Sequence, residues 1–123
     1  MTNSEFKIML EKRTVAFSIA TIKMLRNVPA GYESRNIRDQ LLRSATAIGA
    51  NYREANRAES NADFAHKLAI STKECAETEY WLIILSELYP ETMGLMDVLA
   101  EATKLTGLFG KALRSLAYAD PRT

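Results

Sequence analysis

The sequence has 123 residues but only one cysteine, one histidine and no long apolar run. A single cysteine, Cys75, cannot form a disulfide within the chain, and such usage is typical of a reducing compartment. No stretch reaches the roughly 18 apolar residues that a membrane-spanning helix needs. The first residues also lack the basic and apolar regions of a signal peptide. We therefore expect a soluble, cytoplasmic protein that has no contact with membranes.

Signals for strands and for phosphate-binding loops are missing as well. The five glycines are scattered, and no apolar/polar alternation is bounded by Asn-Gly or Asp-Gly turns. Apolar residues instead recur with the helical period along the whole chain. These features argue against a fold that contains a sheet, and they favour an all-α protein.

The charge is nearly balanced, because 16 Lys/Arg and 15 Asp/Glu give a formal net charge of +1. This balance argues against a strongly basic nucleic-acid-binding domain, although it leaves room for a local basic surface. The two halves differ: residues 1–60 carry ten Lys/Arg and six Asp/Glu, whereas residues 61–123 carry six and nine. The N-terminal half is therefore basic and the C-terminal half acidic.

Helical periodicity divides the chain into four segments separated by short breaks. The first break contains Pro29, which cannot continue a helix. Ser34 and Ser60 are the predicted N-caps of the second and third helices, and Pro90 suits the first turn of the fourth. The predicted helices cover about residues 4–26, 34–57, 61–89 and 91–118. Because short links make neighbouring helices antiparallel, residues 1–123 are predicted to form one domain, an antiparallel up-down-up-down four-helix bundle.

The apolar surface of the first helix is wider than one core stripe requires. Its additional apolar residues are Ile8, Val15, Ile19 and Ile22. A bundle helix that is apolar on two sides needs a second partner. On the third helix, Tyr80 and Trp81 are adjacent, so one of them flanks the core, where large aromatic residues favour an interface. These patterns predict self-association, with Tyr80 and Trp81 as interface candidates.

The stretch Leu42–Ala55, which reads LRSATAIGANYREA, resembles a signature of a known family of four-helix bundle proteins. That family includes the proteins encoded in intervening sequences of bacterial 23S ribosomal RNA genes. The third helix is similar to the family too, in Asp63-Phe64, Lys67-Leu68, Ile70, Lys73-Glu74, Glu77-Thr78 and Tyr80-Trp81-Leu82.

The resemblance implies a four-helix bundle that assembles as a ring-shaped homopentamer. It also implies relatedness to accessory proteins of diversity-generating retroelements, which bind a reverse transcriptase and nucleic acid through a basic surface. This chain differs from those relatives in being nearly neutral, and its third helix carries several acidic residues.

Arginines gather on the side of the second helix that lies opposite its apolar stripe. The candidates for nucleic-acid binding are Arg35, Arg38, Arg53 and Arg57. A guanidinium group can bind two phosphate oxygens at once, and such a contact does not depend on the base sequence. The alternative interpretation is a solvated helix face whose arginines pair with acids of a neighbouring helix or subunit. For Arg43, which lies inside the signature, we expect a structural ion pair.

Polar residues also flank the core faces of the second and third helices. They are Arg43, Ser44, Asn51, Glu54, Lys67, Glu74 and Glu77. If they are buried, such groups must be hydrogen-bonded. We interpret them as a polar network that sets the register between helices or subunits; the alternative is an active site.

Signals for catalysis and cofactors are incomplete. A di-metal bundle needs Glu-x-x-His on two helices, and the only histidine, His66, cannot complete that set. Glu74-x-x-Glu77 has no second acidic pair with which to hold Mg²⁺. Cys75 lies on an apolar stripe between acids, where its thiol is a poor nucleophile. We therefore expect no enzymatic activity, no cofactor and no bound metal.

These observations predict a non-enzymatic oligomeric scaffold or adaptor. Its expected partners are copies of itself, in the pentamer that the resemblance implies, together with RNA, DNA or a nucleic-acid-processing protein. One alternative is a purely structural homo-oligomer without a nucleic-acid ligand. The other is a metal-dependent phosphohydrolase built on a helical bundle.

Overall fold

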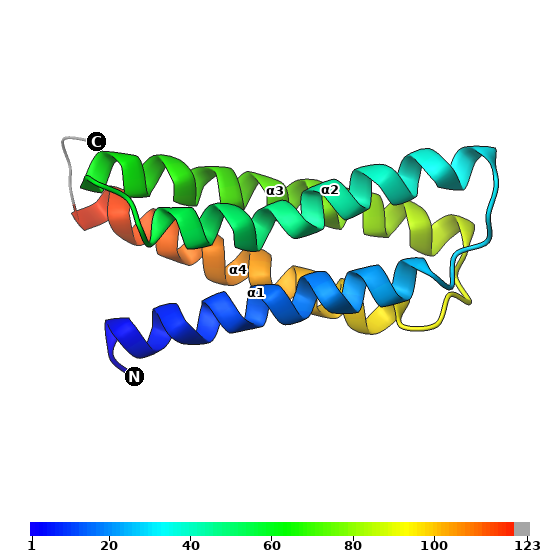
Figure 1. Cartoon of the computed structure of the whole chain (residues 1–123), viewed down its shortest axis with the longest axis horizontal. Coiled ribbons are helices and arrows are strands. Elements are labelled where there is room, and N and C mark those ends of the chain that lie inside the picture. Colours follow the sequence, from blue (N-terminus) through cyan, green and yellow to red (C-terminus); the bar gives the residue numbers. More distant parts are fainter. Residues whose placement is uncertain (120–123) are drawn as a thin grey trace.

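The computed structural model describes residues 1–119, and four long helices account for most of them (Figure 1). They are α1 (Asn3–Leu25), α2 (Tyr32–Ala55), α3 (Asn61–Leu88) and α4 (Leu95–Ala119). Residues 1–119 contain no strand. The all-α, four-helix class predicted from the sequence is therefore confirmed.

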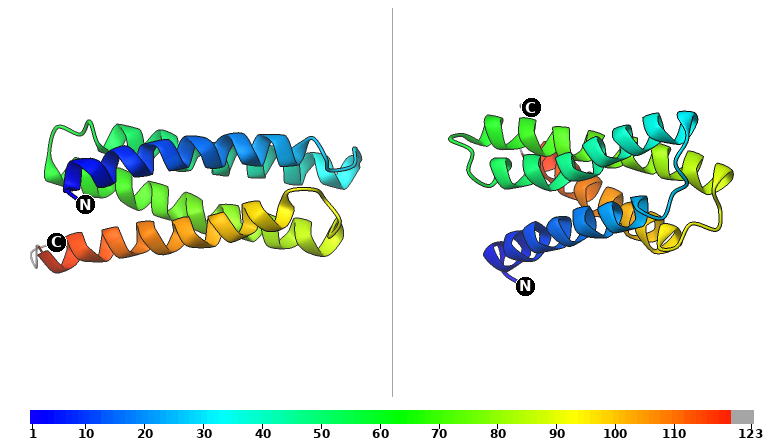
Figure 2. Two further views of the ribbon diagram at one scale, coloured as in Figure 1. Left: turned by 90° about the horizontal axis from the view of Figure 1, so that it is seen from below. Right: turned by 45° about the vertical axis from the view of Figure 1, so that its right-hand side comes forward.

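Each helix packs against the next one along the chain, and α1 returns to contact α4. The chain therefore runs up, down, up and down through the bundle (Figure 1). The contact between α1 and α4 is the least extensive of the four. At the end that holds the N-terminus α1 diverges from α4, whereas their other ends lie together (Figures 1 and 2).

Helix boundaries agree with the sequence where a side-chain cap defines them. The Ser60 hydroxyl accepts the Asp63 backbone N–H at 3.0 Å, and α3 begins at the next residue, Asn61. By contrast, α2 begins at Tyr32, two residues before the predicted cap. Its N-cap is Gly31, and the Ser34 hydroxyl instead donates to the Pro29 carbonyl at 2.7 Å.

The fourth helix begins at Leu95, four residues later than the sequence predicts. Pro90 lies in the loop that follows α3 and not in the first turn of α4. The chain enters α4 through Gly94, whose φ of +87° is a conformation that favours glycine. This turn delays the start of the helix.

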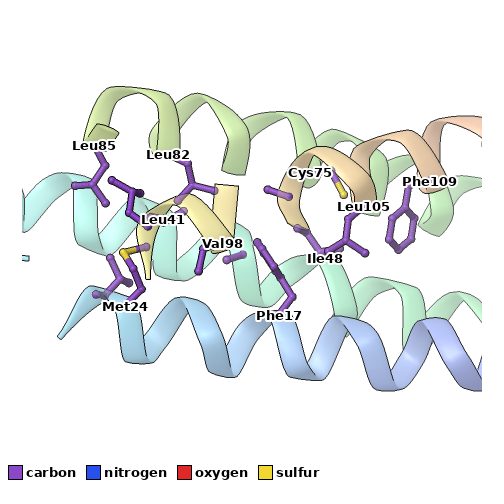
Figure 3. Packing of buried hydrophobic residues seen from close by; sticks show 14 of the residues in the cluster. Phe17, Met24, Leu41, Ile48, Cys75, Leu82, Leu85, Val98, Leu105 and Phe109 are labelled. Carbon is purple, nitrogen blue, oxygen red and sulfur yellow. The ribbon is translucent and has the colours of Figure 1, made fainter. Parts of the chain in front are cut away.

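The core runs the length of the bundle and takes residues from all four helices (Figure 3). Phe17 of α1, Ile48 of α2, Leu82 of α3 and Leu105 of α4 are among its buried members. Near one end, Tyr52 and Phe109 pack edge to face, with their ring centroids 5.3 Å apart. In residues 1–119, none of the helices combines the length and apolar character that crossing a membrane requires.

Candidate functional site

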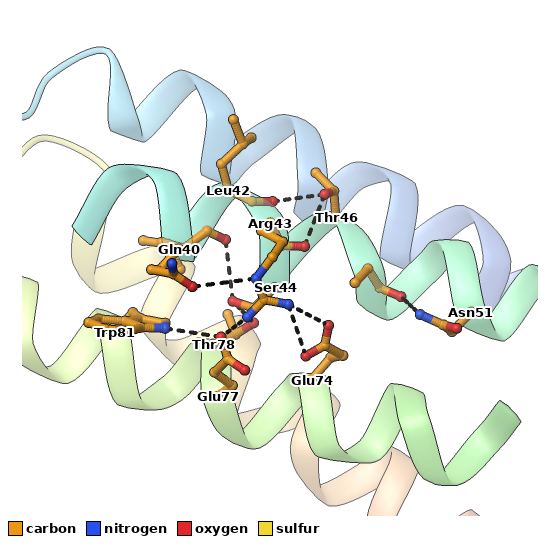
Figure 4. A network of polar contacts seen from close by, with 12 residues as sticks. Gln40, Leu42, Arg43, Ser44, Thr46, Asn51, Glu74, Glu77, Thr78 and Trp81 are labelled. Carbon is orange, nitrogen blue, oxygen red and sulfur yellow. Dashed lines mark hydrogen bonds and ion pairs between the residues drawn. The ribbon is translucent and has the colours of Figure 1, made fainter. Parts of the chain in front are cut away.

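Buried hydroxyl groups join α2 to α3 within the signature stretch. Thr78 donates a hydrogen bond to the Ser44 hydroxyl at 2.9 Å, and Ser71 donates to the Ile48 carbonyl at 3.0 Å (Figure 4 shows the first pair). Ser44, Ser71 and Thr78 are fully buried. Small hydroxyl residues let the two helices approach closely while their polar atoms stay satisfied.

Gly49 marks a close approach between α2 and α1. A Cβ atom added at Gly49 would lie 2.8 Å from Thr14 Oγ1, a distance that real Cβ contacts essentially never show. Thr14 is buried, and its hydroxyl is held by the Leu10 and Glu11 carbonyls of its own helix. The glycine of the signature therefore serves helix packing.

Arg43 lies at the centre of a polar cluster on the surface between α2 and α3 (Figure 4). Its Nη1 is 3.1 Å from Glu74 Oε2, and its Nη2 contacts Glu77. Glu77 also accepts a hydrogen bond from the Trp81 indole N–H at 3.2 Å. The four side chains bridge the two helices, and the carboxylates are already engaged by protein groups.

The other candidates for a polar network lie apart from this cluster. Lys67 Nζ is 3.5 Å from Glu54 Oε2, in a separate ion pair between α3 and α2. Asn51 donates to the Ala47 carbonyl of its own helix at 2.9 Å. The predicted network is thus divided into the Ser44 contact, the Arg43 cluster, the Lys67 pair and an isolated Asn51.

The arginine face of α2 is divided between its two ends. Near the C-terminal end, Arg53 Nε is 3.2 Å and Arg57 Nη1 3.7 Å from the same oxygen of Glu11 on α1. Near the N-terminal end, Arg35 and Arg38 have no carboxylate within 4 Å among residues 1–119. Arg38 and Arg53 are 15 residues apart, roughly 22 Å along the helix axis.

The interface candidates of α3 differ in exposure. Tyr80 is 58% exposed, whereas the neighbouring Trp81 is half-buried against the core. Their rings pack edge to face with centroids 5.2 Å apart. Tyr80 shares its exposed side with Ile83, which is also exposed. These two side chains form an apolar surface on α3.

Comparison with known proteins places this arrangement in a family. The family model for the 23S rRNA-intervening sequence protein matches residues 7–106, which include all of α2 and α3. The chain belongs to this family. A solved structure with the same kind of fold is a protein of unknown function from the S23 ribosomal protein family of Bacteroides thetaiotaomicron. It is 34% identical to this chain, with a TM-score of 0.73, and the match covers 84% of this chain and 96% of that one. A search of curated proteins gave no match.

The descriptions of the family and of its solved member name no reaction. In this family member, burial and then the charges of Glu79 and Glu74 raise the pKa of the Cys75 thiol to about 12. The thiol is therefore protonated at neutral pH, which opposes nucleophilic chemistry. Within the described part of the chain, no three His, Cys, Asp or Glu side chains are grouped so that they could hold a metal ion.

Two acidic residues outside the predicted site connect α1 to other parts of the chain. Glu11 forms ion pairs with Arg53 and Arg57, and it accepts a hydrogen bond from the Asn56 amide N–H at 3.0 Å. Both carboxylate oxygens of Glu101 on α4 accept hydrogen bonds from the Arg13 guanidinium, at 2.6 and 2.9 Å. The hydrogen bond from Arg13 lowers the pKa of Glu101. The partners of the second pair are 88 residues apart, so only the folded chain reveals them.

Proposed function

We propose that this protein is a non-enzymatic scaffold or adaptor that acts as a homo-oligomer. The observation that carries the proposal is an apolar stripe on the outside of α1. Ile8, Val15 and Ile19 are 57%, 45% and 48% exposed, and Ile22 extends the line. Residues 8, 15 and 22 are spaced by seven, so they lie along one side of the helix. Exposed apolar lines of this length are typical of contact surfaces.

The α1 stripe continues onto α2. Val15 and Ile19 line a shallow groove with Thr46 and Ala50, and Leu42 of α2 is also exposed. The Tyr80–Ile83 surface lies on a different side of the bundle, next to α4, since the adjacent Glu79 accepts a hydrogen bond from Thr103. Two unlike apolar surfaces on different sides of the bundle favour a head-to-tail contact between copies, and such contacts form a ring when the rotation between copies closes.

The charge of the chain supports the same arrangement. The α1 and α2 half of the sequence is basic, and the α3 and α4 half is acidic. A head-to-tail contact brings the basic side of one copy to the acidic side of the next. The family resemblance implies five copies, and we take the ring-shaped homopentamer as the proposed assembly.

The replacement of Val15 and Ile19 by Glu tests the contact surface. Two charges in an apolar interface oppose association, because each would have to be desolvated. We expect the double variant to show a lower mass than the unmodified protein by size-exclusion chromatography with light scattering. Leu88→Glu is the matched control, because Leu88 is equally exposed but lies outside both surfaces. An unchanged mass for the double variant would remove α1 from the interface.

A second candidate function is nucleic-acid binding by the arginines of α2. The observation in its favour is that Arg35 and Arg38 meet no acid within 4 Å in residues 1–119, whereas Arg53 and Arg57 share one. Phosphate contacts of this kind bind any sequence. A ring repeats the arginine patch on every subunit, so weak contacts gain avidity.

Charge reversal at the two ends of α2 separates the arginines. We expect Arg35→Glu with Arg38→Glu to weaken RNA or DNA binding more than Arg53→Glu with Arg57→Glu, because Glu11 already offsets part of the second pair. Filter binding over a range of salt concentrations measures this, and log affinity falls by about 0.9 per duplex phosphate neutralised for each unit of log salt. No binding by the unmodified protein at roughly 50 mM salt, where phosphate contacts are strong, would favour a purely structural oligomer.

A further inference from the structure

A cleft opens at the end of the bundle where α1 diverges from α4. Its volume is about 750 Å³, and all four helices contribute to its walls. The walls are largely apolar, with Phe6 of α1, Phe64 of α3, and Leu108 and Leu116 of α4. The volume lies within the range of about 300–1,000 Å³ that is typical of small-molecule sites. The α4 residues that line it lie beyond the region that the family model matches.

One polar side chain of the lining, Asn56, is held by the protein itself. Its Oδ1 atom is buried within the protein, next to the Tyr52 side chain, which also lines the cleft. The amide cannot be reversed at no cost, because its Nδ2 donates to Glu11 Oε2 at 3.0 Å. Buried acceptors are nearly always satisfied. The enclosed Oδ1 atom is not open to a molecule in the cleft, so binding there rests on the apolar walls and on charge.

Positive charge flanks the mouth of the cleft. Lys7 of α1 lies with its Nζ 5.7 Å from the Phe64 ring centroid, and Lys111 of α4 is exposed on the other wall. Within residues 1–119 neither lysine forms an ion pair. Glu59 is the one acidic residue among the described residues of the lining. The mouth therefore favours an anion.

We propose that this cleft binds a small anionic amphiphile: a molecule with an apolar body and an acidic head group. The apolar walls receive the body, and Lys7 and Lys111 face the acid. A docked protein buries about 800 Å² on each side, more than a cleft of this size offers. The proposal is independent of the oligomeric role proposed above.

Fluorescence titration of the full chain with 8-anilino-1-naphthalenesulfonate tests the site, because this dye combines a fused aromatic body with a sulfonate. We expect saturable binding of one dye per chain. Ala112→Phe places a ring inside the cleft and should weaken binding at least about tenfold. Ala100→Phe makes the same change at an exposed position of α4 that does not line the cleft, and it should leave the affinity unchanged.

The charge at the mouth has its own pair of variants. Lys111→Glu should weaken dye binding several-fold, whereas Lys104→Glu, two turns earlier on the same side of α4, should not. Dodecanoate should displace the dye, and dodecyltrimethylammonium, which carries the opposite charge, should not. These measurements decide the proposal even if Ala112→Phe fails to fold, which circular dichroism and a cooperative melt would reveal.

Three results would overturn the proposal. One is the absence of saturable dye binding. Another is an equal effect of the cleft and control substitutions, which would place the dye on another surface. In the third, the unmodified protein binds no dye, and Ala112→Phe changes the mass of the oligomer. A second copy of the chain would then fill the cleft.

Discussion

At the scale of the residue, the close approach of α1 and α2 depends on a glycine and a threonine. Gly49 lets α2 approach α1 at Thr14, and the Thr14 hydroxyl cannot turn away freely because two carbonyls of its own helix accept from it. Gly107 of α4 has the opposite environment, since a Cβ there would meet no atom within 4 Å. The same substitution at the two glycines therefore separates packing from helix propensity.

We expect Gly49→Ala to lower the free energy of unfolding by about 1 kcal/mol. Overpacking costs about 1–3 kcal/mol, and the higher helix propensity of alanine offsets up to about 1 kcal/mol of it. Gly107→Ala, in contrast, should raise the free energy of unfolding by up to about 1 kcal/mol. Urea unfolding of the two variants measures both values. A gain in stability for both would show that α1 and α2 are not in close contact at Gly49.

The second prediction at this scale concerns Cys75. Burial raises its pKa to about 12, and the neighbouring Glu79 and Glu74 act in the same direction. The thiolate is the reactive form, so Ellman's reagent should not modify the folded protein at pH 8 on the time scale of minutes. One thiol per chain should react after denaturation in guanidinium chloride. Rapid reaction of the folded protein would contradict the buried position of Cys75.

At the scale of the element, one ion pair ties α1 to α4. The pair of Arg13 and Glu101 is partly buried and bidentate. It lies between α1 and α4, the two helices with the least extensive contact. The hydrogen bond from Arg13 lowers the pKa of Glu101 below the ordinary value of 4.5. A carboxyl group whose pKa is lower in the folded state stabilises the fold above its unfolded pKa, and this stabilisation is lost as the pH falls through the folded pKa.

Glu101→Gln should therefore destabilise the protein by up to about 1 kcal/mol at pH 7. The difference in unfolding free energy from the unmodified protein should persist down to about pH 4.5 and then shrink as Glu101 becomes protonated. Thermal melts between pH 3 and pH 7 measure it. Thr106→Val, whose hydroxyl donates to the Ala102 backbone carbonyl and to no titrating group, is a control whose effect should not follow this pH dependence. A constant difference for Glu101→Gln over the whole range would exclude the ion pair as its cause.

The helices themselves could be predicted well from the sequence, because periodicity and capping are local. The cap at Ser60 placed the start of α3 correctly. The start of α4 could not be located, because Pro90 is compatible with a first helical turn and only the φ of Gly94 excludes it. Pairing between helices was also out of reach: whether Arg53 meets Glu11 depends on the rotation of α1 against α2. The apolar cleft could not be predicted for the same reason, because it arises where α1 and α4 diverge.

At the scale of the whole molecule, the exposed apolar residues have a pattern that one bundle does not explain. The α1 stripe and the Tyr80–Ile83 surface lie outside the core, on different sides of the bundle. In the proposed head-to-tail assembly, the basic half of one copy would face the acidic half of the next. The polar clusters join α2 to α3, and protein groups already bind the carboxylates in them. These features support the proposed assembly of this member of the 23S rRNA-intervening sequence protein family into a homo-oligomer.

The mass of the unmodified protein in solution tests this account most directly. Light scattering at micromolar concentration should give about five times the 13.8 kDa of one chain. The value should hold across a tenfold dilution, because an interface built on the α1 stripe is apolar and persists at low concentration. A mass of 13.8 kDa at every concentration would contradict self-association and with it the proposed scaffold.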